Sequence, residues 1–206
     1  MNITVLIPTI RRINNFEYLQ QSLKNNRSVF NSKNIWTGKS LFSERYLFLD
    51  PYDYEELKNL LSIYNLIPIY RTVYPELTIF PNQSYDYWVA HLCLDFVNSM
   101  EYALKSSSSE YIMWLEDDTY LSPLFLREFR RFRQKNPHFQ VVSPYHSWEF
   151  QSCFACIVFQ RNTLKKFIDL VAQKWCDKVP LDWMFQYCDY RYLNKNYAQT
   201  KPKLAL

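Results

Sequence analysis

Glycine is almost absent from this chain. Gly38 is the single glycine among 206 residues, where ordinary usage would give roughly 14. The sequence therefore excludes the glycine-rich phosphate-binding loops of P-loop and dinucleotide-binding proteins, which need more than one glycine. Backbone positions that need a positive φ angle must be filled by other residues, and the many asparagines are the natural candidates.

Long apolar runs, a cysteine framework and a strong net charge are missing as well. No stretch approaches the roughly 20 apolar residues of a membrane span, and no signal peptide precedes the first predicted strand. The five cysteines show no framework spacing, which predicts reduced thiols and a cytoplasmic protein. A net charge of +4 does not indicate nucleic-acid binding, although a local basic spot would suffice for a nucleotide.

The residues that are present indicate a well-packed globular protein, with 48% hydrophobic and 18% aromatic residues. We expect one domain over residues 1–206. Apolar periodicity predicts alternating strands and helices, which is typical of an α/β fold with a mostly parallel central sheet flanked by helices. The predicted strands are Asn2–Pro8, Arg45–Leu49, Leu66–Val73, Tyr111–Leu115, Phe139–Ser143 and Cys153–Gln160. The predicted helices are Asn14–Lys24, Asp53–Tyr64, Asp86–Leu104, Leu124–Arg133, one capped by Asn162, and one from Pro180 to about Asn194.

The chain is organised around an acidic turn after the strand Tyr111–Leu115. Glu116, Asp117 and Asp118 end this apolar run, and three carboxylates cannot be buried without compensating cations. The strand should therefore emerge at a sheet edge and present its acids in a cleft. Ser122 is predicted to cap the next helix, with Pro123 in its first position. Such a unit suits a hard divalent cation with a substrate's phosphates; the alternative is a solvated acidic turn.

Three predicted turns should meet at one edge of the sheet, because ligands of open α/β sheets bind beyond the carboxyl ends of the strands. These turns are Thr9–Arg12, Asp50 and Glu116–Asp118. Arg11 and Arg12 would face the three acids across a bound diphosphate and its cation. Alternatively, either arginine is an ordinary surface residue of its turn.

Five collinear motifs resemble the N-acetylglucosaminyltransferase IV family, a group of GT-A-fold glycosyltransferases. The opening strand runs into a Pro-Thr-x-(Lys/Arg)-Arg pattern, and the acidic stretch resembles the family's Tyr-Tyr-Ile-Gln-Leu-Glu-Asp-Asp. A Tyr-Pro-Asp-Leu, a Leu-Asp-Tyr on the long helix and a Pro-Ile-Asp-Trp-Leu also have matches here. The residues that carry the resemblance are Ile7–Arg12, Tyr74–Leu77, Leu94–Phe96, Tyr111–Asp118 and Pro180–Met184.

This resemblance implies a GT-A-like, metal-dependent, inverting glycosyltransferase that moves a sugar, such as GlcNAc, from a UDP-sugar to a glycan hydroxyl. Mn²⁺ or Mg²⁺ would be held by Asp118 and Asp117. The residues expected at the nucleotide are Pro8, Thr9, Arg11, Arg12, Asp50, Asp95, Glu116 and Asp117. The family's animal members carry a Golgi anchor and stem, which this chain lacks. We therefore expect a viral or microbial homologue, or a fragment of a longer polypeptide with further domains.

Asp182 is the predicted catalytic base, because inversion needs a carboxylate opposite the leaving diphosphate. It opens a helix after Pro180, where the helix dipole keeps a carboxylate ionised; the alternative is a capping residue without chemistry. Asp95 and Glu149 are reserve candidates. The acceptor, whose sugar rings stack on aromatic side chains, is expected at Tyr145, His146, Trp148, Glu149 and Trp183.

Two other functions are compatible with the sequence. A nucleotidyl- or phosphoryl-transfer enzyme would use the same acids on the diphosphate. A catalytically impaired pseudo-transferase or carbohydrate-binding module would fit a chain that reaches Leu206 without the family's C-terminal histidine. We expect no nucleic-acid partner.

Overall fold

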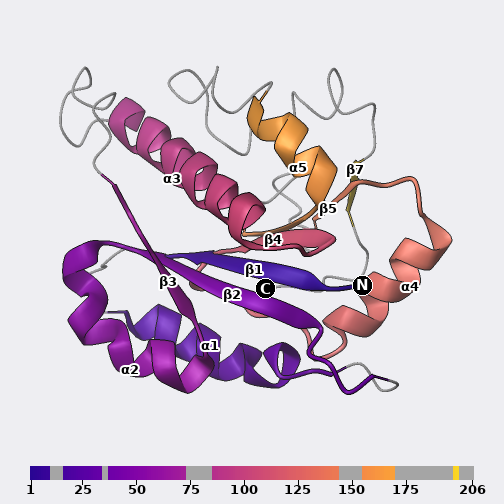
Figure 1. Ribbon diagram of the computed structural model, residues 1–206, viewed down its shortest axis with the longest axis horizontal. Helices are drawn as coiled ribbons and strands as arrows, with labels where there is room; N and C mark the ends of the chain where they lie inside the picture. The colour runs from indigo at the N-terminus through magenta and orange to yellow at the C-terminus, as the bar shows by residue number, and fades with distance from the viewer. Residues whose placement is uncertain (10–15, 34–36, 73–84, 144–154, 170–196, 200–206) are drawn as a thin grey trace.

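The computed structural model describes residues 1–9, 16–33, 37–72, 85–143, 155–169 and 197–199 (Figure 1). Helices and strands alternate along most of the described chain, as predicted. In order they are β1 (Ile3–Pro8), α1 (Glu17–Phe30), β2 (Phe42–Leu49), the 3-10 turn η1 (Pro51–Asp53), α2 (Tyr54–Tyr64), β3 (Ile67–Tyr70), α3 (Tyr85–Ser106), β4 (Tyr111–Leu115), α4 (Phe125–Lys135), β5 (Val141–Ser143), β6 (Cys156–Gln160), α5 (Arg161–Phe167) and β7 (Tyr197–Gln199).

The strands form one seven-stranded sheet in the order β3-β2-β1-β4-β6-β5-β7. The first four strands of this order run parallel, with β1 between β2 and β4. Strand β6 is antiparallel to both of its neighbours, and β7 pairs in parallel with β5. The prediction of a mostly parallel sheet is therefore confirmed.

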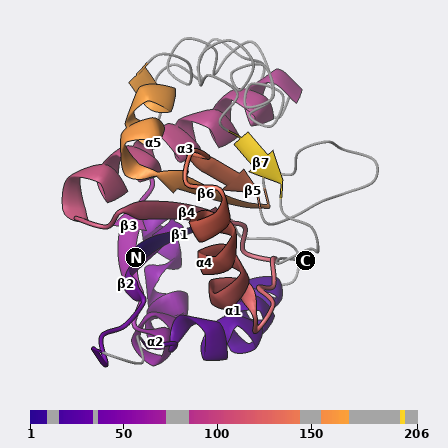
Figure 2. The same ribbon diagram turned by 90° about the vertical axis from the view of Figure 1, so that its right-hand side faces the viewer.

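Helices cover both faces of this sheet, so its central strands must be apolar on both sides. Figures 1 and 2 show α1 and α2 on one face and α3 and α5 on the other. Strand β4 alternates between the two layers: Tyr111, Met113 and Leu115 pack with α1, α2 and α4, whereas Ile112 and Trp114 pack with α3 and α5. All five are buried, which explains the uninterrupted apolar run before the acidic turn.

Several local predictions are wrong in detail. Helix α4 begins at Phe125, and Ser122 and Pro123 belong to a turn ahead of it, in which the Ser122 carbonyl accepts the Phe125 N–H at 2.8 Å. The predicted strands do not include β7, whose Gln199 pairs with Ser143. Three residues carry too little periodicity to reveal such a short strand.

Two further expectations need correction. Cys93, which is buried on α3, is disulfide-bonded. The prediction of reduced thiols is therefore wrong at Cys93, because sequence spacing does not reveal which thiols a fold brings together. The thiols then no longer support the prediction of a cytoplasmic protein. Among the described residues, positive φ angles occur at Gly38, Asn65 and Phe16, so the expectation that asparagines would fill such positions is confirmed at Asn65 and not at Phe16. A φ of 64° is unusual for a buried aromatic residue such as Phe16, which directly precedes α1.

Candidate functional site

The ends of four parallel strands meet at one edge of the sheet, on the side where β2 leads into α2 (Figure 1). Thr9 follows β1, and its N–H donates to the Phe48 carbonyl at 2.9 Å. Arg71 follows β3, and its N–H donates to the Leu49 carbonyl at 2.8 Å. Asp50 follows β2, and the acidic turn follows β4. The expected convergence of the strand ends is thus present.

Arg71 is the centre of an ion-pair network at this edge. Its Nε donates to both carboxylate oxygens of Asp95, at 3.0 and 2.9 Å, and its Nη1 donates to Oδ2 of Asp50 at 2.7 Å. Its Nη2 donates to the Thr9 carbonyl at 3.3 Å, and the guanidinium lies over the Phe48 ring. One planar cation therefore joins the ends of three strands to α3, a geometry that lysine cannot reproduce.

This network explains how the carboxylate of Asp95 can be buried. It lies on α3 among apolar residues and is only 3% exposed. A carboxylate is tolerated there because Arg71 pairs with it in a two-pronged geometry, and His91 Nδ1 lies 3.4 Å from its Oδ2. Asp50 is also within the network, so two of the predicted site residues are joined through Arg71.

The three acids of the turn after β4 differ in their surroundings. Asp117 is 5% exposed, and its Oδ2 accepts a hydrogen bond from the Thr9 hydroxyl at 2.9 Å. Asp118 and Glu116 are both half-buried. The Glu116 N–H donates to the Ala155 carbonyl. The Glu116 carbonyl accepts the Thr119 N–H, and this hydrogen bond closes the turn. The Thr9–Asp117 hydrogen bond fixes the ends of β1 and β4 to one another.

Helix α1 holds the chain just beyond the acids. The Thr119 carbonyl accepts hydrogen bonds from Ser22 Oγ and Asn26 Nδ2, both at 2.8 Å. Asn26 Oδ1 also accepts the Leu121 N–H at 2.6 Å. Asn26 is fully buried, so each bond is shielded from water. The acidic turn is therefore held rigidly between β1 and α1.

Tyr52 is an exposed aromatic side chain beside Asp50, with 78% of its surface accessible. The Asp50 carboxylate is the largest cause that raises the pKa of the Tyr52 phenol, followed by burial. The phenol therefore stays neutral at physiological pH and offers a ring and a hydroxyl at the strand edge. Tyr52 and Arg71 were not predicted from the sequence as site residues. The available signal for Arg71 was a lone cation within the apolar strand predicted over Leu66–Val73.

Many predicted site residues lie outside the described part of the chain. Pro8 is described and pairs with Phe48 in the β1–β2 ladder. The residues that lie outside are Arg11, Arg12, Tyr145, His146, Trp148, Glu149, Asp182 and Trp183. Among the described residues, no group of three or more histidine, cysteine or acidic side chains is arranged to hold a metal ion. Within the same segments, no helix is long and apolar enough to cross a membrane.

No protein-family model matches the chain, and no curated protein matches its sequence. Solved structures do resemble its fold. The 4-diphosphocytidyl-2C-methyl-D-erythritol synthase of Anaerococcus prevotii aligns with 98% of this chain and 88% of its own, at 12% identity and a TM-score of 0.56. S. aureus TarS 1–349 in complex with UDP aligns with all of this chain and 59% of its own, at 11% identity and a TM-score of 0.59.

The mannosyltransferase PcManGT from Pyrobaculum calidifontis, in complex with GDP-Man and Mn²⁺, aligns with 98% of this chain and 54% of its own, at 11% identity and a TM-score of 0.57. These neighbours are nucleotidyltransferases and glycosyltransferases, and they confirm the predicted GT-A-like fold class. They do not support the narrower resemblance to the N-acetylglucosaminyltransferase IV family, which stays a hypothesis.

Proposed function

We propose that this protein is a metal-dependent glycosyltransferase that uses a nucleotide-sugar donor. The observation that carries the proposal is the hydrogen bond from Thr9, which directly follows β1, to Asp117 in the acidic turn after β4. It holds the end of β1 and the acidic turn together at the carboxyl ends of the strands, where α/β sheets bind their ligands.

The nucleoside end of the donor would lie over Asp50 and Tyr52. The Asp50 carboxylate can accept a ring N–H of a base such as uracil, and the exposed Tyr52 ring can stack on the base. Arg71 orients Asp50 by holding its Oδ2. Asp95 would act as a positioning residue for Arg71, since it is buried against that guanidinium. Pro8 and Thr9 would border the nucleotide.

Asp118 is the proposed metal ligand, with Glu116 beside it. Asp117 is less suited to this role, because its carboxylate is buried and holds Thr9. Mg²⁺ in nucleotide sites is usually bound by one or two carboxylates together with substrate phosphates and water, which this donor set fits. A bound Mn²⁺ or Mg²⁺ would supply a Lewis acid for the leaving diphosphate. Arg11 and Arg12 are proposed to contact the same diphosphate.

The donor is proposed to be a UDP-sugar, and N-acetylglucosamine follows only from the family resemblance. Asp182 would accept the proton of the attacking hydroxyl, while the anomeric C–O bond to the diphosphate breaks with inversion. The acceptor would contact Tyr145, His146, Trp148, Glu149 and Trp183.

Nucleotidyl transfer is the second candidate, because the Anaerococcus prevotii synthase shares the fold over most of both chains. Both functions place a nucleotide at the same edge of the sheet. They differ in the bond that breaks: glycosyl transfer releases a nucleoside diphosphate, whereas nucleotidyl transfer from a triphosphate releases pyrophosphate.

Incubation with UDP-N-acetylglucosamine, UDP-glucose, UDP-galactose and GDP-mannose, each with Mn²⁺, tests the proposal directly. We expect slow release of UDP or GDP from at least one donor, because glycosyltransferases transfer to water at a low rate. Chelation by EDTA should abolish this release. Release of pyrophosphate from CTP or UTP, without sugar-nucleotide turnover, would favour nucleotidyl transfer. Binding without turnover would indicate a carbohydrate-binding or pseudo-transferase protein.

Replacement of Asp182 by asparagine tests the proposed base. Positioned proton transfer contributes roughly 10²- to 10⁴-fold, and we expect kcat for glycosyl transfer to fall by that factor. Donor binding with Mn²⁺ should be unchanged, because the base contacts the acceptor hydroxyl. If the variant keeps most of its kcat, Asp182 is a capping residue and another group accepts the proton.

A further inference from the structure

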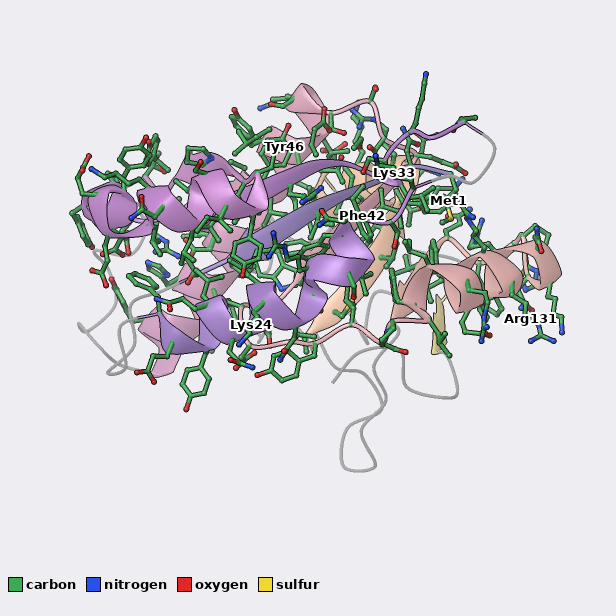
Figure 3. All side chains as sticks on the ribbon, turned by 90° about the horizontal axis from the view of Figure 1, so that it is seen from below. Met1, Lys24, Lys33, Phe42, Tyr46 and Arg131 are labelled. Carbon is green, nitrogen blue, oxygen red and sulfur yellow. The ribbon has the colours of Figure 1, made fainter. Side chains whose placement is uncertain are left out.

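A groove of about 600 Å³ lies between α1 and α2, on the face seen in Figure 3. Its volume is in the range of small-ligand sites. Helix α1 supplies most of the lining, α2 supplies two residues, and one residue follows the acidic turn. The lining residues are Glu17, Tyr18, Gln20, Gln21, Lys24, Leu60, Tyr64 and Tyr120. None of the predicted site residues that the structure describes belongs to this groove.

The chemistry of the lining selects one class of ligand. Three phenol rings provide flat apolar surfaces, and two carboxamides provide paired donors and acceptors. Leu60 is the single aliphatic side chain among the described lining residues, which disfavours an acyl chain or a lipid. Among the described lining residues, Glu17 and Lys24 contribute opposite charges that balance, so this part of the lining does not favour a polyanion. Aromatic rings with amides and balanced charges suit neutral sugar units, which offer apolar faces and many hydroxyls.

The aromatic side chains differ in how firmly they are placed. Tyr64 is half-buried and packs against the hydrophobic core beneath α2. Tyr120 is also half-buried, and the hydrogen bonds of Ser22 and Asn26 to Thr119 and Leu121 hold the chain on both sides of it. Tyr18 is 46% exposed and offers the accessible ring. Two of the three lining tyrosines are thus held in place before binding, so they need little further ordering when a ligand binds.

The groove also adjoins the proposed donor site. Tyr120 is two residues beyond Asp118, so their Cα atoms are at most about 7 Å apart. A sugar chain with one end at the acidic turn could therefore continue into the groove. The rigid attachment of this segment to α1 keeps the two places in a fixed relation.

We propose that the groove between α1 and α2 binds a neutral oligosaccharide, as an extended subsite for the acceptor or product glycan. The link to acceptor or product rests on the proposed function; binding of the oligosaccharide itself does not. Sugar units beyond the reacting one would lie against Tyr18, Tyr64 and Tyr120.

Titration with neutral tetrasaccharides, followed by saturation-transfer NMR and calorimetry, tests this inference. The probes are tetrasaccharides of N-acetylglucosamine, glucose, galactose and mannose. We expect at least one to bind with a dissociation constant below about 10 mM, with or without UDP and Mn²⁺. Tyr18→Ala should weaken binding on the order of tenfold, because it removes the accessible stacking surface. Tyr18→Phe should keep the affinity within about twofold, because it retains the ring.

Tyr102→Ala is the matched control, since Tyr102 is 42% exposed on α3, outside the groove. It should leave binding unchanged. The inference is overturned if no probe binds, or if Tyr18→Ala and Tyr102→Ala lose equal affinity. Donor turnover is measured separately in Tyr18→Ala. If the protein turns over a donor but binds no oligosaccharide, the proposed role of the groove is wrong and the proposed function stands. If an oligosaccharide binds through Tyr18 but no donor is turned over, the proposed function is wrong and binding in the groove stands.

Discussion

Asp118→Ala is expected to abolish turnover of the nucleotide-sugar donor. A metal that stabilises a leaving diphosphate contributes several kcal/mol to the transition state, so the rate should fall by at least about a thousandfold. The fold should survive, because Asp118 is half-buried in a turn that is closed by backbone hydrogen bonds of Glu116 and Thr119. Turnover is measured as release of UDP or GDP at saturating Mn²⁺, with the melting temperature recorded in parallel.

Glu110→Ala provides the control for Asp118→Ala. Glu110 precedes the opposite end of β4, its side chain is 50% exposed, and it lies 4.0 Å from the N-terminal amine. Its loss removes one acid next to β4, at the end opposite to the acidic turn, so turnover should be unchanged. If Asp118→Ala retains wild-type turnover, or if both variants lose it equally, the metal-binding role of the turn is refuted.

Arg71→Met should produce the largest loss of stability. Removing one partner of a buried ion pair typically costs about 3–5 kcal/mol, because the remaining charge stays buried without compensation. Here Asp95 would remain 3% exposed beside Asp50, without the guanidinium that now binds both carboxylates. We expect the free energy of unfolding, measured by urea titration, to fall by that amount. Nucleotide binding should weaken in parallel, because Asp50 loses its orientation.

Two further variants separate this effect from the simple loss of an arginine. Arg127→Met removes an exposed arginine that pairs with Glu128 on the surface of α4, and should cost at most about 1 kcal/mol. Combining Arg71→Met with Asp95→Asn should recover part of the lost stability, since it neutralises the buried carboxylate. If Arg71→Met is no more destabilising than Arg127→Met, or if the double variant recovers nothing, the network does not stabilise this edge.

The basic surface of α4 contrasts with the described lining of the groove, in which the charges of Glu17 and Lys24 balance. Arg127, Arg131 and Lys135 are exposed on this helix, whose apolar residues Phe125 and Phe129 are buried in the core. Figure 3 shows Arg131 on the outer side of the molecule, well away from Lys24 on α1. None of these cations is among the described residues that line the groove between α1 and α2.

The sequence by itself determined the alternation of strands and helices, the parallel core of the sheet and the acidic turn after β4. These features are local: an apolar run such as Tyr111–Leu115 and the acids that end it are adjacent in the chain. The rule that parallel strands present their carboxyl ends at one edge then placed Thr9, Asp50 and the acidic turn together. The proposed roles of Asp182 and the residues around Trp148 remain predictions, because these positions lie outside the described residues.

Only the tertiary structure decided how the residues of that edge are paired. Arg71 and Asp95 are 24 positions apart, and their contact depends on how α3 lies across the sheet. The Thr9–Asp117 hydrogen bond spans 108 positions. Neither contact leaves a periodic signal, because sequence patterns report which face of an element is apolar and not which neighbour faces it. The groove between α1 and α2 could not be predicted from the sequence for the same reason. Its tyrosines come from three separate segments, and only the folded chain determines how these segments pack.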